Sequence, residues 1–223
     1  MLPGLSQAVS FRYWPAAPSR IDGWAALVKR GLDLTIALLG LVILSVPMLL
    51  AAVAIKLDSP GPALFRQHRI GLDNRGFELW KLRTMYCQAS DYRSLRQATR
   101  NDPRVTRVGA WLRRFSLDEV PQLIQVLRGE MSLVGPRPHA PGTCAAGVPF
   151  EQLSDRYVLR HQVLPGITGL AQVRGWRGET DTPDKLLRRL DSDLEYIATW
   201  SLRLDLLLLL RTVGCVLSMR NAW

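Results

Sequence analysis

The chain has 223 residues, of which 48% are hydrophobic and 22% are charged. This balance excludes a wholly disordered chain, because such chains are poor in apolar residues. The formal net charge is +10, and 25 of the 29 basic residues are arginine. Arginine binds phosphate groups in two-point geometry, so the composition suits nucleic acid, anionic lipid or a phosphorylated substrate without choosing among them.

Cysteines and histidines are too few and too far apart to form a disulfide framework or a zinc site. The three cysteines (Cys87, Cys144 and Cys215) lie far apart, and the three histidines are scattered. An odd set of distant thiols excludes a disulfide framework and a cysteine-based zinc site, and it points to reduced thiols on the cytosolic side. We interpret the histidines as structural.

An apolar segment follows the N-terminal region. Residues 1–28 contain three prolines and no strong hydrophobic period, which predicts a flexible or loosely docked lead-in. Residues 34–55 then hold 22 consecutive positions without a charge. About 20 such residues cross the hydrocarbon core of a bilayer as a helix, so the sequence predicts a membrane helix over residues 29–57.

Two features argue against a simple crossing by this helix. Pro47 lies inside the apolar run and predicts a kink, and the hydroxyl of Ser45 is placed to satisfy a carbonyl that the kink frees. Basic residues flank both ends, whereas basic loops prefer the cytoplasmic side. A helix that bends at Pro47 and returns to the same face fits both features, and a kinked spanning helix is the alternative.

Residues 58–223 are predicted to form a cytoplasmic α+β domain that is mostly helical. Strand-like runs at 63–69 and 77–83 enclose turn residues and predict a small β-hairpin. Helical or mixed segments are predicted over 85–100, 105–114, 117–127 and 183–200. The apolar stretch at 204–219 is short for a span, which predicts an amphipathic helix in the membrane interface or packed on the domain.

Two adjacent acids, Asp118 and Glu119, stand at the start of a predicted helix. Ser116 with Glu119 matches a capping box, and acids are favoured in a first helical turn, so a purely structural role is one interpretation. In the other, the helix N-terminus lowers the carboxylate pKa, and an ionised acid beside phosphate-binding arginines is a nucleophile for phosphoryl chemistry. Paired carboxylates also suit Mg²⁺, which shares oxygen ligands with substrate phosphates.

Four basic residues are candidates for contact with a phosphate. Arg113 precedes the acidic pair, and Arg137 follows it on a segment stiffened by two prolines. Lys81 and Arg83 alternate on the second hairpin strand and are predicted to point to one face. That face either contacts a diphosphate or lipid headgroup or lies in solvent.

Together these motifs resemble the bacterial sugar transferase family, monotopic polyprenyl-phosphate phosphoglycosyl transferases that start exopolysaccharide or O-antigen repeat units. The resemblance covers about residues 28–220. Its motifs are KRGLDL, SPGPALFRQHRIG, WKLRTM, DPRVTRVGAWLRRFSLDEVPQL, MSLVGPRPH and LPGITGLAQVRGWRGETDT, in this order. The resemblance implies re-entry of the membrane helix at Ser45 and Pro47, and a place on the cytoplasmic face of the bacterial inner membrane.

The same resemblance implies an activity. Asp118 would attack the β-phosphorus of a UDP-sugar, UMP would leave, and polyprenyl phosphate would take the phosphosugar from the aspartyl enzyme. Glu119 would assist through Mg²⁺ or by orienting Asp118, with Arg113 and Arg137 near the substrate phosphates. The segment GWRGETDT resembles the subgroup that transfers glucose 1-phosphate, with galactose 1-phosphate as the alternative in short forms.

Some features depart from the family pattern. The chain resembles a short form that lacks the extra N-terminal membrane helices of many relatives, and Ala171 stands where relatives often have Trp. The implied partners are a UDP-sugar, undecaprenyl phosphate and membrane lipid, not nucleic acid, and a homodimer is compatible with this interpretation. The competing hypotheses are a membrane-anchored basic binding protein and an inactive scaffold of a polysaccharide-assembly complex. Replacing Asp118 with Asn separates a binding protein from an enzyme.

Overall fold

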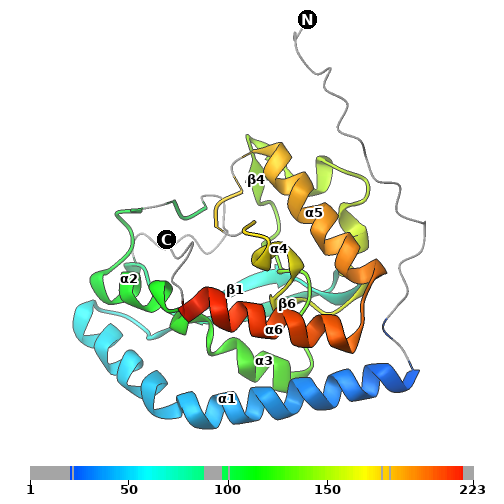
Figure 1. Ribbon diagram of the computed structural model, residues 1–223. Helices are drawn as coiled ribbons and strands as arrows, with labels where there is room; N and C mark the ends of the chain where they lie inside the picture. Colours follow the sequence, from blue (N-terminus) through cyan, green and yellow to red (C-terminus); the bar gives the residue numbers. More distant parts are fainter. Residues whose placement is uncertain are drawn as a thin grey trace, which may run out of the picture.

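The computed structural model describes residue 21 and residues 23–87, 97–99, 101–176, 178–180 and 182–217. Helices predominate and the sheets are small, so the expected mostly helical α+β class is confirmed. The long helix α1 (Gly23–Asp58) runs along one side of the molecule, and the rest of the fold packs above it (Figure 1).

Helix α1 has 36 residues, which correspond to about 54 Å. It begins at Gly23, inside the segment expected as a lead-in, of which residues 1–20 and 22 lie outside the described residues. Its ribbon bends toward the C-terminal end, in the half that contains Pro47 (Figure 1). The hydroxyl of Ser45 donates to the carbonyl of Val42 at 2.7 Å, next to the Ile43 carbonyl that Pro47 has no N–H to bond.

The surface of α1 is largely apolar and uncovered. Ile43, Leu49 and Leu50 are 72%, 66% and 64% exposed. Within the described part of the chain, α1 is the one helix long and apolar enough to cross a membrane by length and composition. An apolar patch of this kind marks an interaction surface, and it is compatible with membrane association.

The hairpin forms as the sequence predicts. Strands β1 (Leu64–Ile70) and β2 (Gly76–Leu82) pair antiparallel. The turn residues Asp73 and Asn74 have φ values of 51° and 59°. Asp and Asn tolerate this left-handed conformation, which explains why the turn falls there.

The remaining elements close the domain. Strand β3 (Ser132–Val134) pairs in parallel with β6 (Gly166–Thr168), and β4 (Cys144–Ala145) pairs antiparallel with β5 (Val148–Pro149). The further helices are α2 (Arg107–Arg114), α3 (Gln122–Arg128), α4 (Leu170–Val173), α5 (Pro183–Ala198) and α6 (Leu202–Leu217). The helix expected over 85–100 falls largely on residues 88–96 and 100, outside the described residues; residues 85–87 and 97–99 are not α-helical.

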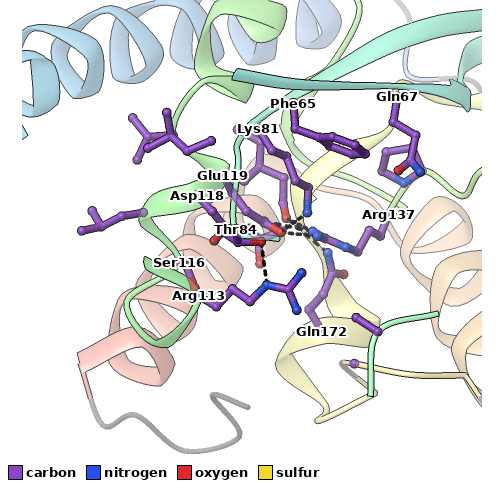
Figure 2. A pocket seen from close by; sticks show the side chains of 18 of the residues that line it. Phe65, Gln67, Lys81, Thr84, Arg113, Ser116, Asp118, Glu119, Arg137 and Gln172 are labelled. Atoms are coloured by element: carbon purple, nitrogen blue, oxygen red, sulfur yellow. Dashed lines mark hydrogen bonds and ion pairs between the residues drawn. The ribbon is translucent and has the colours of Figure 1, made fainter. Parts of the chain in front are cut away.

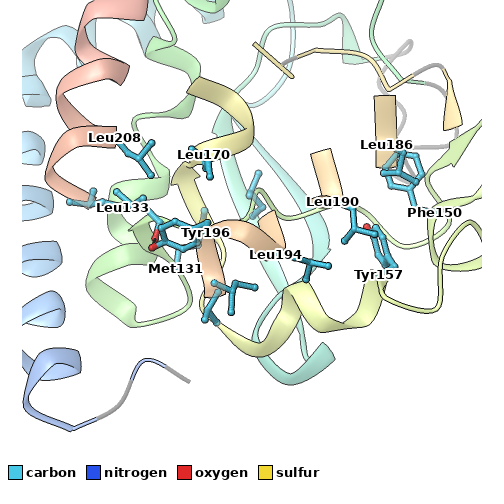
Figure 3. Close-up of a cluster of buried hydrophobic side chains, with 14 of the residues drawn as sticks. Met131, Leu133, Phe150, Tyr157, Leu170, Leu186, Leu190, Leu194, Tyr196 and Leu208 are labelled. Atoms are coloured by element: carbon cyan, nitrogen blue, oxygen red, sulfur yellow. Dashed lines mark hydrogen bonds between the residues drawn. The ribbon is translucent and has the colours of Figure 1, made fainter. Parts of the chain in front are cut away.

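The main hydrophobic core joins α5 and α6 to the small parallel sheet (Figure 3). Leu133, Leu190 and Tyr196 are at most 5% exposed, and Leu208 of α6 is fully buried. Burial of each large apolar side chain stabilises the fold by about 1.5–3 kcal/mol. Leu210 of the same helix is 72% exposed. Helix α6 therefore packs on the domain with one face, and its opposite face is apolar and uncovered.

Both ends of α1 are attached to this domain by buried polar contacts. Near the N-terminal end, Lys29 Nζ lies 2.6 Å from Asp205 Oδ2 of α6. At the C-terminal end, Arg83 donates to the carbonyls of Ile55 and Ser59 at 3.1 and 2.6 Å. Breaking either contact would remove a buried charge-assisted hydrogen bond, so the helix is fixed to the domain at both ends.

Candidate active site

A cavity of about 660 Å³ lies where the hairpin, the segment after α2 and strand β6 meet (Figure 2). Asp118 and Glu119 line it, together with Lys81, Arg113 and Arg137. Leu44 of α1 lines it as well, so the cavity extends to α1 directly before Ser45 and Pro47.

The acidic pair does not begin an α-helix. Asp118 lies in a short 3₁₀ helix (Leu117–Glu119), and α3 starts only at Gln122. Ser116 has a φ of 56° and makes no side-chain cap, so the predicted capping box is wrong. The reason is that the carboxylate of Glu119 binds two cations instead, and charge-assisted hydrogen bonds of about 1.5–3 kcal/mol outweigh a cap contact of about 1 kcal/mol.

Glu119 is held from two other elements. Lys81 Nζ on β2 donates to Glu119 Oε1 at 2.9 Å, and Arg137 donates to both carboxylate oxygens, with 3.1 Å between Nη1 and Oε2. Burial alone raises the pKa of Glu119, but the charges of Arg137 and Lys81 outweigh it and keep this pKa below its usual range. Glu119 is therefore an ionised, fixed carboxylate that ties the hairpin to the Pro-Arg-Pro segment.

Asp118 lies beside this network without being held by it. It is 7% exposed, and no hydrogen bond or ion pair from a described residue ends on its carboxylate. Burial raises the pKa of Asp118 to about 6, although the nearby charge of Lys81 opposes the shift. The prediction that a helix N-terminus lowers this pKa is thus wrong, because loss of water dominates. At neutral pH the carboxylate is mostly ionised and poorly solvated, as a nucleophile requires.

The remaining predicted cations separate into two groups. Arg113 donates from Nε to Thr84 Oγ1 at 2.8 Å, and its charge is close enough to lower the pKa of Asp118 (Figure 2). Arg83 also lines the cavity, but its guanidinium turns to the end of α1 and donates to backbone carbonyls there. It does not share a strand face with Lys81, because β2 ends at Leu82 and the last carbonyls of α1 need a donor. Arg83 is therefore a structural cap of α1.

Arg137 stands on a backbone platform made by two of the sequence motifs. The N–H of Gly135 donates to the Thr168 carbonyl at 2.9 Å, and the N–H of Gly166 donates to the Pro136 carbonyl at 2.9 Å. A Cβ on Gly166 would lie 2.1 Å from the nitrogen of Gly135, so only glycine permits this approach. The GPRP and PGITG motifs thus act together to hold Arg137 in place.

A second buried cluster lies behind Arg137, and sequence reasoning missed it. Arg160 donates to the Arg137 carbonyl at 2.7 Å and pairs with Asp193 at 2.7 Å, with both side chains 2% exposed. His139 contacts Arg160, and its Nδ1 lies 2.8 Å from the hydroxyl of Tyr157. Burial, helped by the charge of Arg160, lowers the pKa of His139 well below its ordinary value, so the imidazole is neutral. The signal in the sequence that could have found this cluster is Asp193, a charged residue on the buried face of α5.

Asp118 and Glu119 are the candidate ligands of a magnesium ion shared with a substrate. Among the described residues, no group of three or more His, Cys, Asp or Glu side chains is placed to hold a metal. Mg²⁺ is usually bound through one or two carboxylates plus phosphate oxygens rather than by an all-protein cage. Asp118 and Glu119 supply that set of hard oxygen donors.

Comparison with known proteins connects this site to a family. The sequence profile of the bacterial sugar transferases matches residues 24–219. The chain belongs to the bacterial sugar transferase family. The matched region contains the acidic pair, the Pro-Arg-Pro segment and α1 from its second residue.

Three curated members of this family are close relatives. The undecaprenyl-phosphate glucose phosphotransferase of Komagataeibacter xylinus is 53% identical over 91% of this chain and 38% of its own length. The UDP-glucose:undecaprenyl-phosphate glucose-1-phosphate transferases of Caulobacter vibrioides and Escherichia coli K12 are 52% and 49% identical, over 88% and 89% of this chain and 72% and 42% of their own lengths. The chain thus spans about two fifths of the first and last of these relatives.

Proposed function

We propose that this chain transfers glucose 1-phosphate from UDP-glucose to polyprenyl phosphate, forming a polyprenyl-diphosphate sugar that begins an exopolysaccharide repeat unit. The proposal rests on one observation: the two adjacent acids have different surroundings. Glu119 is fixed by Lys81 and Arg137, whereas Asp118 keeps a buried carboxylate with a pKa near 6 and no partner among the described residues. The names of two relatives contain UDP-glucose and undecaprenyl phosphate, which supports these two substrates. UDP-galactose is the alternative donor.

In the first step, an oxygen of Asp118 attacks the β-phosphorus of the UDP-sugar. The bond from that phosphorus to the bridging oxygen breaks, UMP leaves with the electron pair, and a phosphosugar stays on the carboxylate. Arg137 and Lys81 lie beside the nucleophile, where their charges stabilise the phosphoryl group as negative charge develops on it. Arg113 adds a third positive charge near the same carboxylate.

In the second step, an oxygen of polyprenyl phosphate attacks the same phosphorus. The acyl phosphate bond breaks, the diphosphate sugar forms, and Asp118 returns as a free carboxylate. Because Leu44 of α1 lines the cavity, the lipid phosphate would approach the site along α1. One phosphate site therefore serves both steps.

Magnesium fits this scheme as the proposed cofactor, held by Asp118 and Glu119 together with the diphosphate. When bound, Mg²⁺ neutralises phosphate charge as a Lewis acid. Glu119 also has a role that does not require the metal. It holds Lys81 and Arg137 at fixed distances from Asp118, so the phosphate-binding charges are in place before the substrate arrives.

The membrane part of the proposal is a re-entrant helix on the cytoplasmic face of the bacterial inner membrane. Both ends of α1 bind the same domain through Lys29 and Arg83, which supports two flanks on one side of the bilayer. Replacing Pro47 with Leu should straighten the helix and push one flank across. Flank labelling with a membrane-impermeant reagent checks this, and two flanks that stay on the cytoplasmic side in the variant would contradict it.

The experiment that tests the function is UMP release from a panel of UDP-sugars. Detergent-solubilised protein would be assayed with Mg²⁺ and undecaprenyl phosphate, with Asp118→Asn alongside. Release with UDP-glucose that falls at least about 10³-fold in the variant is the expected result. No release by folded protein with any sugar would favour the binding or scaffold hypotheses, and a fully active variant would exclude Asp118 as the nucleophile.

A further inference from the structure

Arg69 of strand β1 lines the same cavity, although it was not among the site residues predicted from the sequence. The strand register pairs Arg69 with Phe77 and Phe65 with Lys81. Because side chains alternate along a strand, Phe65, Gln67 and Arg69 share the sheet face that carries Lys81. Figure 2 shows Phe65, Gln67 and Lys81 directed from the hairpin into the cavity.

The guanidinium of Arg69 has little to balance its charge. It donates from Nη2 to the side-chain oxygen of Gln67, and its Nε is shielded from water without a hydrogen-bond partner. No carboxylate of a described residue forms an ion pair with it. Burial and the charge of the neighbouring Arg137 lower the pKa of Arg69 to about 10. A partly desolvated cation beside another cation is costly unless an anion joins them.

Three of the other cations around the cavity have an anionic partner. Lys81 and Arg137 share the carboxylate of Glu119, and Arg104 pairs with Asp102 at 2.6 Å. Arg69 differs from these three because, among the described residues, the one hydrogen-bond partner of its guanidinium is a neutral amide. A positive charge without an ion pair to a described residue therefore lies next to Arg137.

We infer that Arg69 binds a substrate phosphate group together with Arg137. The inference rests on the proposed function and adds a substrate-binding residue to it. A phosphate group presents the oxygens that a guanidinium fork matches at two points, and it supplies the missing negative charge. Two sources share this chemistry, the diphosphate of the UDP-sugar and the phosphate of the lipid acceptor, and the kinetic test separates them.

The kinetic test compares Arg69→Gln with Arg66→Gln in the full chain. Arg66 is a matched control, because it lies on the opposite face of the same strand, its side chain is 56% exposed, and its partner Glu78 is 3.7 Å away. Loss of a charge-assisted contact in Arg69→Gln should raise the KM of one phosphate substrate about ten- to a hundredfold. Arg66→Gln should stay within about twofold of wild type.

Varying the two substrates separately identifies the phosphate. A raised KM for UDP-glucose with slowed UMP release in the absence of acceptor assigns Arg69 to the diphosphate. A raised KM for undecaprenyl phosphate with normal UMP release assigns it to the lipid. Arg69→Lys should recover part of the loss, because it restores the charge without the fork. Unchanged KM values for both substrates in folded Arg69→Gln would overturn the inference.

A binding test remains valid if the proposed activity fails. Inorganic pyrophosphate should raise the thermal unfolding midpoint of wild type and of Arg66→Gln, and this rise should be lost in Arg69→Gln. Equal stabilisation of all three proteins, or of none, would contradict a phosphate site at Arg69. Absence of UMP release from wild type with an intact pyrophosphate effect would instead refute the proposed reaction and leave the phosphate site standing.

Discussion

Two buried clusters of charged side chains meet at Arg137, and they differ in whether each carboxylate has a cation as its partner. In the cluster behind it, the carboxylate of Asp193 lies 2.7 Å from Arg160, and both side chains are 2% exposed. In the cluster that lines the cavity, Glu119 is paired in a similar manner, but Asp118 has no hydrogen bond or ion pair with any described residue. Asp193 thus has a counter-ion within the protein, whereas Asp118 has none among the described residues.

The difference shows how the excess of arginine is divided. Arg160 is used inside the fold, where it contacts His139 and donates to the backbone carbonyl of Arg137. Arg69 and Arg113 face the cavity. Removing one partner of a buried ion pair is expected to lower stability, whereas removing the unpaired charge of Asp118 is expected to raise it. The predictions below test this contrast.

Asp193→Asn should have the largest effect on stability. It leaves Arg160 buried without its counter-charge, which costs about 3–5 kcal/mol and lowers the thermal unfolding midpoint by roughly 6 to 20 °C. Arg188→Gln serves as the control, because its pair with Asp184 is exposed at both ends, and it should shift the midpoint by less than about 2 °C.

Should Asp193→Asn fail to fold, the double variant Asp193→Leu with Arg160→Met keeps the prediction testable. Replacing both charges by apolar groups is much less costly than removing one. A single variant as stable as wild type, or a double variant less stable than the single one, would show that this ion pair is not the anchor of the cluster.

Asp118→Asn should change stability in the opposite direction. Its pKa in the folded protein is raised from 3.8 to about 6, so the ionised form destabilises the fold above that pH by up to about 3 kcal/mol. Removing the charge should therefore raise the unfolding midpoint at pH 8 by roughly 2 to 10 °C and give little change at pH 4, where the wild-type carboxyl is protonated. Glu119→Gln is the contrasting variant. It removes the negative charge that pairs with Lys81 and Arg137, so it should lower the unfolding midpoint at pH 8. A loss of stability in both variants would remove the distinction between the two acids.

The pH dependence of the first step should follow Asp118. Attack requires the deprotonated carboxylate, so single-turnover UMP release without acceptor should fall about tenfold per pH unit below pH 6 and level off above it. Omitting the acceptor removes the titration of the lipid phosphate from the profile. Glu119 stays ionised across this range, since its pKa lies below its usual value. A rate that is constant from pH 5 to pH 8 would be inconsistent with Asp118 as the nucleophile.

Local patterns predicted much of the fold. The turn at Asp73 and Asn74, the amphipathic α5 and the apolar α1 follow from residue preferences and hydrophobic spacing, which act over a few residues. The acidic pair and Arg137 were also found from the sequence, because charged residues clustered near turn and proline motifs.

What the sequence could not predict depends on contacts between distant segments. The capping box at Ser116 is locally reasonable, but Lys81 and Arg137 come from other elements and take Glu119 away from it. The raised pKa of Asp118 results from burial by the assembled domain. Arg83 was predicted to bind a ligand, yet the end of α1 needs its guanidinium as a cap. Only the folded chain shows which cation goes to which partner.

The most direct measurement is the intact mass of the protein after mixing with UDP-glucose and Mg²⁺ in the absence of lipid acceptor. We expect a species heavier by one hexose phosphate, mapped to the peptide that contains Asp118 and lost on addition of undecaprenyl phosphate. The species should be absent from Asp118→Asn. UMP release at the full rate without any such species, or an adduct that persists in Asp118→Asn, would contradict the covalent role of Asp118.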